Sequence, residues 1–356
     1  MKIADNRARH STLAAICCRR TANSGRAAAT QRERHEADAR SQNANQKCTC
    51  APATWSSTRI HRAPVTMPGI MAATTAVPLE ETLVIVGVGL IGGSIAAAAR
   101  RRGLARQIIG VGRNPERLEQ ARQAGFLDAV VTDPATAGPN AFIVFCTPVN
   151  HIAAAVERIL PRLPAGAIIT DAGSTKRRMC EALADWAGRD PTFLGSHPIA
   201  GSEKQGFEHA DPELFAGRTC VITPLSGHRP ADITRVRRFW AGLGMTVVSL
   251  SPAEHDQALA STSHVPHVVA AALADSLSES DRRLTGTGFA STTRIAAGDP
   301  DLWTAILCEN AGPVADGLLR LQARLGDFER ALRAGDVPAL KSLLQTAKTK
   351  RDALDG

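Results

Sequence analysis

Short apolar runs separated by mixed polar segments recur along residues 80–250. The runs at 83–86, 108–111, 142–145 and 167–170 predict buried strands, and further strands are expected near 192–195, near 219–223 and in a last helix–strand pair through Val248. The segments at 115–124, 149–160 and 174–186 predict helices between them. Alternation of this kind predicts a doubly wound parallel sheet with helices on both faces, an α/β fold.

The pattern changes at Ser251. The run Ser251-Pro-Ala-Glu254 has the form of a capping box with proline at the first helical position, and the residues after it predict helices without a convincing strand. We therefore expect an α/β domain at 80–250 and an all-helical second domain at 251–356. Long apolar faces in a helical domain of this size favour a homodimer formed through it.

A glycine-rich turn interrupts the first apolar run. The strand at 83–86 breaks into Gly87-x-Gly89-x-x-Gly92, and an alanine-rich helix follows directly. In this context the first glycine permits a tight turn, the second lets the backbone approach a pyrophosphate, and the third lets the helix pack on the strand. The free N–H groups of the helix N-terminus then face the anion. The turn predicts a Rossmann-type dinucleotide site.

The first seventy residues differ from the rest in charge. They hold twelve Lys or Arg and four Asp or Glu, which accounts for the whole net charge of +8, whereas residues 71–356 hold thirty of each. The high isoelectric point therefore describes this segment and not the folded protein. Little hydrophobic periodicity and many Ser, Ala, Thr, Gln and Asn residues predict that 1–76 is a disordered basic extension.

Three interpretations of this extension compete. Met67 and Met71 stand just before the first strand, which favours a functionless leader from a start assigned too far upstream. An organelle transit peptide is the second interpretation, although the acidic residues at 33–38 weaken it. Nucleic-acid binding is the least favoured, because Trp55 is the only aromatic residue available for stacking on bases.

The eight cysteines have spacings that fit neither a zinc knuckle nor a disulfide scaffold, which favours a reducing, cytoplasmic compartment. No stretch reaches the roughly 18–20 continuous apolar residues of a membrane span. His255, His264 and His267 suggest a metal triad. On one straight helix, at about 100° per residue, His255 would lie about 180° from His264, so we expect no metal site.

Three further clusters follow later strands or lie in the helical region, where an open α/β sheet places its ligand crevice. Together with the glycine turn they resemble the prephenate/arogenate dehydrogenase family of tyrosine biosynthesis over about residues 82–310. The matching motifs are Gly-Leu-Ile-Gly-Gly-Ser at 89–94, Cys-Thr-Pro-Val at 146–149, Asp-x-Gly-Ser-x-Lys at 171–176, His-Pro-Ile-Ala-Gly-Ser-Glu at 197–203, Ser-His-x-Pro-His at 263–267, and Thr-Arg-Ile-Ala with Asp-Pro-x-x-Trp at 292–303.

The resemblance implies a role for each site residue. His197 would be the catalytic group on the substrate's ring hydroxyl, oriented by Ser174, and Arg294 would bind a substrate carboxylate. His267, Glu203 and Ser202 would line the substrate site, with Trp303 packed nearby. Cofactor contacts would come from Gly87, Gly89, Leu90, Ile91, Gly92, Arg113, Cys146, Thr147 and Pro148. The implied partners are a small-molecule substrate, prephenate or arogenate, and a second copy of the chain, with no nucleic acid and no membrane.

The chemistry asks for the same residue types. Removing hydride from C4 of prephenate requires a group to accept the hydroxyl proton, and histidine, with a pKa near 6.5, suits this at neutral pH. A neighbouring hydroxyl can fix its tautomer, and an arginine can hold a carboxylate by two parallel bonds. The alternatives stay open at this point: His197 as a plain loop residue, Arg294 as a surface ion-pair partner, and Glu203 as a solvated acid.

The choice between NAD and NADP depends on the end of the second strand. An NAD site usually ends this strand in Asp or Glu, about 20 residues after the glycines, but here it ends Gly110-Val-Gly-Arg113. Arg113, with Arg117 as a second candidate, can meet a 2′-phosphate, which modestly favours NADP. Another departure is Ser291, where the family often has an aspartate three residues before the arginine; this bears on how Arg294 is positioned.

Two other functions compete with this interpretation, and one further class of enzyme is excluded. A short-chain dehydrogenase is excluded because the chain has no tyrosine for its Tyr-Lys pair. A β-hydroxyacid dehydrogenase would share the overall plan but needs a lysine on the first long helix of the second domain, and 251–279 has none. A dinucleotide-sensing protein without catalysis would keep the glycines, but it would have no need of His197, Ser174 and Arg294 together.

Overall fold

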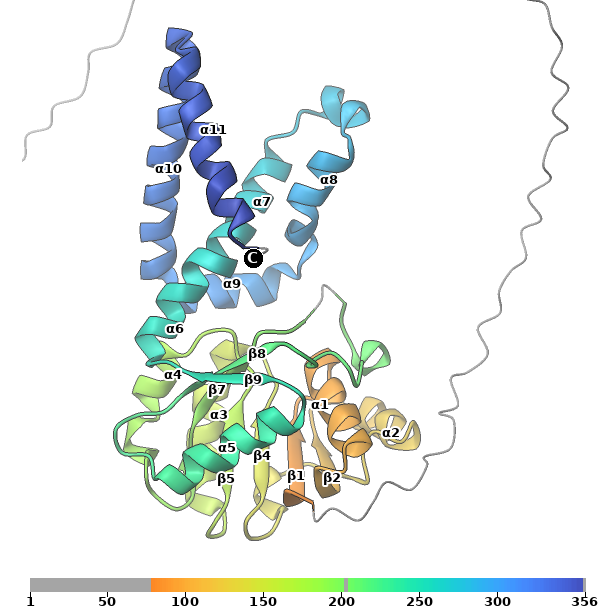
Figure 1. The fold of residues 1–356 in the computed structure, drawn as a ribbon. Coiled ribbons are helices and arrows are strands. Elements are labelled where there is room, and N and C mark those ends of the chain that lie inside the picture. The colour runs from red at the N-terminus through yellow and green to blue at the C-terminus, as the bar shows by residue number, and fades with distance from the viewer. Residues whose placement is uncertain (1–77, 202–203, 355–356) are drawn as a thin grey trace, which may run out of the picture. The chain divides into compact units, whose positions relative to one another are not determined.

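The computed structural model describes residues 78–201 and 204–354, which all belong to one compact unit, Ala72–Gly356. The expectations for residues 1–76 fall outside the described residues. Figure 1 shows strands and helices alternating up to β9 and helices alone after it. Among the described residues, no helix has the length and apolar character needed to cross a membrane.

The main sheet has six parallel strands in the order β3-β2-β1-β4-β5-β6. These strands are β1 (Glu80–Val86), β2 (Ala105–Val111), β3 (Ala129–Val131), β4 (Phe142–Phe145), β5 (Ile168–Asp171) and β6 (Thr192–Phe193). The order reverses between β1 and β4. In an open α/β sheet this switch point is where the ligand crevice lies, so the fold places the glycine turn after β1 beside Cys146 after β4. The predicted α/β fold of Rossmann type is confirmed.

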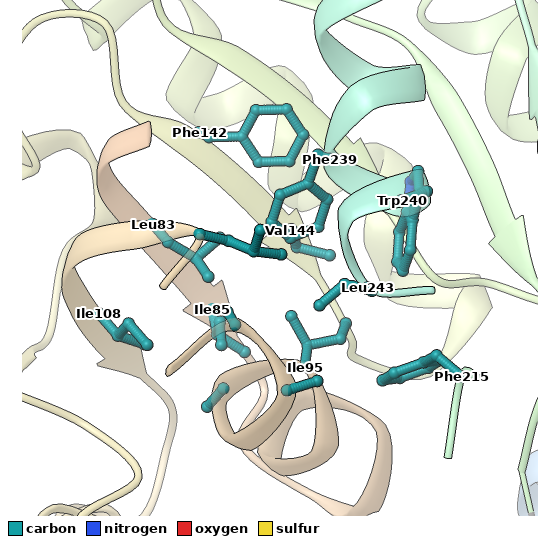
Figure 2. Close-up of a cluster of buried hydrophobic side chains, with 14 of the residues drawn as sticks. Leu83, Ile85, Ile95, Ile108, Phe142, Val144, Phe215, Phe239, Trp240 and Leu243 are labelled. Carbon is teal, nitrogen blue, oxygen red and sulfur yellow. The ribbon is translucent and has the colours of Figure 1, made fainter. Parts of the chain in front are cut away.

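Helices cover both faces of this sheet. They are α1 (Leu90–Arg101), α2 (Pro115–Gln123), α3 (Val149–Ile159), α4 (Arg177–Ala182) and α5 (Pro230–Gly242). One buried cluster combines residues of α1 and α5 with the sheet, and Figure 2 shows Phe239 beside Phe142, with Ile95 and Trp240 in the same cluster. A second cluster, on the other face, joins α3 and α4 to residues such as Ile143. Each fully buried large apolar side chain contributes about 1.5–3 kcal/mol, so the two clusters hold the sheet between its helices.

The expectation that all strands belong to one parallel sheet is wrong for the last three strands. The last strands, β7 (Gly195–Pro198), β8 (Thr219–Thr223) and β9 (Thr246–Ser249), form a separate three-stranded sheet in which β7 and β8 are antiparallel. The chain leaves the main sheet after β6 because side chains replace the strand ladder there. Asp171 accepts a hydrogen bond from the backbone N–H of Ser196, and the hydroxyl of Thr170 donates to the carbonyl oxygen of Leu194.

The helix expected at 174–186 is also shorter than predicted. Its first residues form a loop, α4 covers only Arg177–Ala182, and a 3₁₀ turn follows at Ala184–Trp186. Other 3₁₀ segments lie at Pro134–Thr136, Leu160–Arg162, Phe207–His209, Glu279–Leu284 and Arg294–Ala297. The loop before α4 matters because it carries Ser174 and Lys176 beside the strand end of β5.

After β9 the described chain is helical. It forms α6 (Pro252–Leu259), a π-helical turn (Ala260–His264), α7 (Val265–Asp275), α8 (Thr287–Thr293), α9 (Pro300–Glu309), α10 (Ala311–Ala334) and α11 (Val337–Asp352). The predicted capping box is present, since Ser251 and Glu254 each bond the other's backbone N–H. Gly335, with φ of +62°, ends α10 in a left-handed turn, and α10 and α11 then form the hairpin seen in Figure 1.

Candidate active site

The glycine turn after β1 has the geometry of a dinucleotide cradle. Gly87 has φ of +95°, a value that side-chain-bearing residues rarely adopt, and a Cβ on Gly92 would lie 2.2 Å from the carbonyl oxygen of Gly87. A Cβ on Gly89, in contrast, would meet nothing within 4 Å. The first turn of α1, which begins with Leu90 and Ile91, contains no acidic residue. The turn therefore offers open space at the N-terminus of α1, where backbone N–H groups would hold a pyrophosphate.

The segment Cys146-Thr147-Pro148, between β4 and α3, lies against this turn. A Cβ on Gly87 would be 2.9 Å from the carbonyl oxygen of Cys146, and the hydroxyl of Thr147 is buried without a hydrogen-bond partner among the described residues. A buried polar group without a partner costs free energy unless a ligand satisfies it. The glycine turn and the segment Cys146-Thr147-Pro148 thus lie side by side, and they fit a dinucleotide.

Arg113 and Arg117, which follow β2, differ in their contacts. Arg113 is exposed, and it forms no hydrogen bond or ion pair with another described residue. Arg117 donates to both carboxylate oxygens of Glu208, at 2.6 and 3.0 Å, and lies over the ring of Phe207. Arg117, the second candidate for a 2′-phosphate contact, is therefore engaged with the loop before β8. Arg113 is the one left available.

His197 on β7 is held by a histidine from the helical region. Its Nδ1 lies 2.9 Å from Nε2 of His255 on α6, and Nδ1 of His255 lies 2.7 Å from a carboxylate oxygen of Asp256. The side chains of His255 and Asp256 are almost fully buried. Burial lowers the pKa of His197 well below its usual value, and the nearby His255 and Lys176 lower it further. At neutral pH His197 is uncharged, as a proton acceptor must be.

A second buried pair lies beside this chain of groups. The ammonium of Lys176 bonds the carboxylate of Asp171 at the end of β5, and both side chains are completely inaccessible to solvent. Asp171 also accepts hydrogen bonds from the backbone N–H groups of Gly173 and Ser196. The pair has no net charge, and it ties the loop before α4 to the start of β7. It thereby fixes the backbone that carries His197.

The predicted substrate-binding residues of the helical region lie on neighbouring segments. Arg294 begins a 3₁₀ turn that packs against α7, and its side chain is exposed. His267 on α7 stacks flat on Trp303 of α9, and its Nδ1 is buried without a partner among the described residues. A cation and an unsatisfied buried nitrogen on adjacent segments suit an anionic substrate.

The structure does not bring every predicted residue together. Ser174 is half-buried, and among the described residues no hydrogen bond joins it to His197, so its role as the orienting group stays a prediction. Ser202 and Glu203 lie outside the described residues. Ser291 is exposed on α8, three residues before Arg294, and no hydrogen bond within the described part of the chain joins the two.

The argument against a metal site assumed one straight helix for the histidines on α6 and α7, and this assumption is wrong. The π-helical turn Ala260–His264 interrupts the helix, so it is not one regular α-helix. Because a π-turn holds an extra residue, His255 and His267 fall within about 20° of each other instead of about 120°. His264 is held separately, by the side-chain amide of Asn310 at 3.0 Å. Among the described residues, no group of three His, Cys, Asp or Glu side chains is placed to hold a metal ion.

Sequence reasoning missed His255, Asp256 and Asn310 as site residues. Asn310 donates to the backbone carbonyl of Asp256 as well as to His264, so it joins α10's start to α6. A signal for the first two was present: the dipeptide His255-Asp256 directly follows a capping box, which places it in the first turns of a helix. No pattern in the sequence shows that this helix faces His197.

Comparison with known proteins agrees with this arrangement. The family model described as the nucleotide-binding domain of prephenate dehydrogenase matches residues 95–249, and the one described as its dimerization domain matches residues 251–346. A prephenate dehydrogenase of Bacillus subtilis (strain 168) is 29% identical over 285 residues, covering 78% of this chain and 76% of that protein.

Two solved structures share the fold over most of the chain. A prephenate dehydrogenase from A. aeolicus, in complex with hydroxyphenyl propionate and NAD+, is 31% identical with a TM-score of 0.72, covering 77% of this chain and 98% of the other. A Synechocystis arogenate dehydrogenase is 32% identical with a TM-score of 0.66, covering 77% and 99% respectively. With the glycine cradle, the buried histidine and both domains matched, this chain belongs to the prephenate dehydrogenase family of oxidoreductases.

Proposed function

We propose that this protein oxidises and decarboxylates prephenate or arogenate, yielding 4-hydroxyphenylpyruvate or tyrosine, with NAD(P)+ as hydride acceptor. The observation that carries the proposal is the position of His197: a buried, uncharged imidazole on β7, bonded to His255 of α6, in the helical region that also carries Arg294 and His267. A dinucleotide sensor would need only the glycine cradle.

The residues of this chain divide the reaction as follows. His197 takes the proton of the substrate's ring hydroxyl, so that the C4–O bond gains carbonyl character as the C4–H bond breaks. A bound NAD(P)+, held at the turn of Gly87, Gly89 and Gly92, would supply the acceptor for the hydride of C4. Arg294 holds a substrate carboxylate by charge-assisted hydrogen bonds and so orients the ring. Loss of CO2 from C1 leaves its electron pair in the ring, which becomes aromatic.

A direct assay tests the proposal. Purified protein is given prephenate or arogenate with NAD+ or NADP+, and formation of reduced cofactor is followed by absorbance while the product is identified by mass spectrometry. We expect turnover with at least one substrate and release of one CO2 per hydride transferred. Cofactor binding without turnover of either substrate would remove the enzymatic proposal and leave the sensor.

For the cofactor, we infer a preference for NADP. The described end of β2 carries no carboxylate for a ribose 2′-hydroxyl, and Arg113 is exposed there and unpaired among the described residues. An arginine adds a charge-assisted bond to a 2′-phosphate, worth about 1.5–3 kcal/mol, that NAD does not offer. The same position in an enzyme that accepts both cofactors would give equal efficiencies, which the assay distinguishes.

We also infer a homodimer formed through residues 251–356. The match to a dimerization domain supports this, as do the exposed apolar side chains on the α10–α11 hairpin, among them Leu319, Leu325, Leu332 and Leu344. Light scattering coupled to size-exclusion chromatography tests it, and a mass of one chain at micromolar concentration would contradict it.

A further inference from the structure

The carboxylate of Asp256 is held in place before it meets any histidine. One oxygen accepts the backbone N–H of Lys176 at 2.8 Å, and the other accepts that of Arg177 at 2.9 Å. These N–H groups form the N-terminus of α4, which stabilises a negative charge. Burial alone would raise the pKa of Asp256, but hydrogen bonds from His255, Arg177 and Lys176 hold it below its usual value. Asp256 is therefore ionised at neutral pH.

An ionised carboxylate only accepts hydrogen bonds, and this fixes the protons of both histidines. Nδ1 of His255 must carry a proton to donate to Asp256, so Nε2 of the neutral ring holds the lone pair. That lone pair must accept from Nδ1–H of His197, 2.9 Å away. Nε2 of His197 is then left with its lone pair free for the substrate. The directions of both hydrogen bonds follow from the charge of Asp256, which is separated from His197 by the ring of His255.

We propose, on the basis of the function proposed above, that His255 and Asp256 are positioning residues that hold His197 in the tautomer able to accept the substrate's hydroxyl proton. In the reaction the hydroxyl O–H bond breaks and an N–H bond forms at Nε2 of His197. The Nδ1 proton of His197 shifts toward Nε2 of His255, so the positive charge is shared by both rings and balanced by Asp256.

The negative charge of Asp256 is needed because of the other ionisable groups that face His197. Lys176 on the loop before α4 forms a closed pair with Asp171 at the end of β5. His264 and Cys220 contribute no charge, since burial lowers the pKa of His264 to about 4 and raises that of Cys220. A positive charge on a buried imidazole would otherwise be uncompensated, which is costly. Among the described residues, Asp256 is the carboxylate that lies in this chain of hydrogen bonds and can offset it.

The first test reads the tautomers without any substrate. Long-range nitrogen–proton NMR of the protein labelled at histidine distinguishes a ring protonated at Nδ1 from one protonated at Nε2. We expect both His197 and His255 to be protonated at Nδ1, with their signals assigned from His197→Asn and His255→Phe variants. An Nε2-protonated form of either ring would overturn the proposal, even if the enzyme turns over its substrate as proposed.

The second test measures coupling in catalysis. Asp256→Asn keeps the shape but removes the charge, and His255→Phe keeps a ring but breaks the chain. Each change should lower kcat by about 10-fold to 100-fold with little effect on KM or on cofactor affinity. Asp256→Asn should also move the acidic limb of the kcat/KM profile to lower pH, because the imidazolium loses its counter-charge.

The double variant separates a relay from a structural role. If Asp256 acts through His255, adding Asp256→Asn to His255→Phe should change kcat by less than about 2-fold. Asp232→Asn is the matched control, since Asp232 is also buried and hydrogen-bonded but pairs with Arg229 at the start of α5. Additive losses, or an unmoved pH limb in Asp256→Asn, would overturn the proposal. Absence of wild-type turnover would instead remove the proposed function, and the NMR result would still decide the tautomers.

Discussion

The imidazole of His267 lies flat on the indole of Trp303, with ring centroids 3.5 Å apart and planes 11° from parallel. Gly298 backs this stack: a Cβ at that position would lie 2.4 Å from Nε1 of Trp303 and 3.3 Å from the His267 ring. Gly298 thus keeps the indole in place against His267. The stack joins α7 to α9 next to the segment that carries Arg294.

We predict that Gly298→Ala raises KM for the substrate about 10-fold or more, because the indole must move off the imidazole that it supports. Cofactor affinity should stay unchanged, since the glycine cradle follows β1 in the α/β region, whereas Gly298 lies in the helical region. Steady-state kinetics and a cofactor titration by fluorescence measure both. Gly288→Ala on α8 is the control, as a Cβ there meets nothing within 4 Å; equal kinetics in the two variants would contradict the role of Gly298.

For His197→Asn we predict a loss of about 10²–10⁴-fold in kcat with cofactor affinity nearly unchanged. Asparagine can still bond His255, so the fold is kept, but it cannot take the hydroxyl proton. Stopped assays with high enzyme concentration measure the residual rate. Turnover near the wild-type rate would show that another group accepts the proton.

The cofactor preference predicts opposite effects of two substitutions after β2. Arg113→Ala should raise KM for NADP about 10-fold or more and leave NAD nearly unchanged, because only NADP carries the phosphate that the guanidinium contacts. Gly112→Asp should shift the preference toward NAD by repelling the 2′-phosphate. It should fold, since its Cβ would lie 3.5 Å from Leu118, an ordinary contact. Equal effects of Arg113→Ala on kcat/KM for both cofactors would mean that Arg113 does not contact the phosphate.

Acid should destabilise the fold through its buried histidines. Burial lowers the pKa of His264 to about 4, while the unfolded chain keeps the ordinary value of 6.5. As pH falls below about 6.5, the unfolded chain therefore binds protons that the folded chain does not, and the free energy of unfolding decreases. Urea unfolding at about pH 7.5 and pH 5.5 should show a loss of about 1 kcal/mol from His264 alone. His264→Gln should reduce this dependence on pH, and His209→Gln, at an exposed position, should not.

The sequence predicted what depends on local pattern. The strand before Gly87 and the helix that begins at Leu90 follow from contiguous residues, and the capping box at Ser251 lies within four positions. The separation of β7 from the main sheet does not, because it depends on Asp171 bonding the backbone of Ser196, 25 positions away. The contact of His197 with His255 spans 58 positions and two domains, so no local pattern contains it.

Ser174 and Arg117 show that a motif also leaves the partner of a side chain undetermined. Both were predicted from their place in a motif or near a strand end, where a side chain has several possible partners. Arg117 meets Glu208, 91 positions along the chain, which no motif indicated. A motif therefore places a backbone at the site, while the packing of distant segments decides which atoms its side chains meet.

The π-helical turn between α6 and α7 also affects how sequences of this family should be aligned. Because the turn amounts to one residue inserted into a regular helix, a chain one residue shorter within 260–264 would form an unbroken α-helix with the same faces on both sides. In such a chain the π-helical turn would become α-helical, and the faces on which His255 and His267 lie would stay the same. A one-residue gap placed within α7 before His267 would turn that histidine by about 100°, away from Trp303. Where an alignment puts this gap thus decides which histidines it equates.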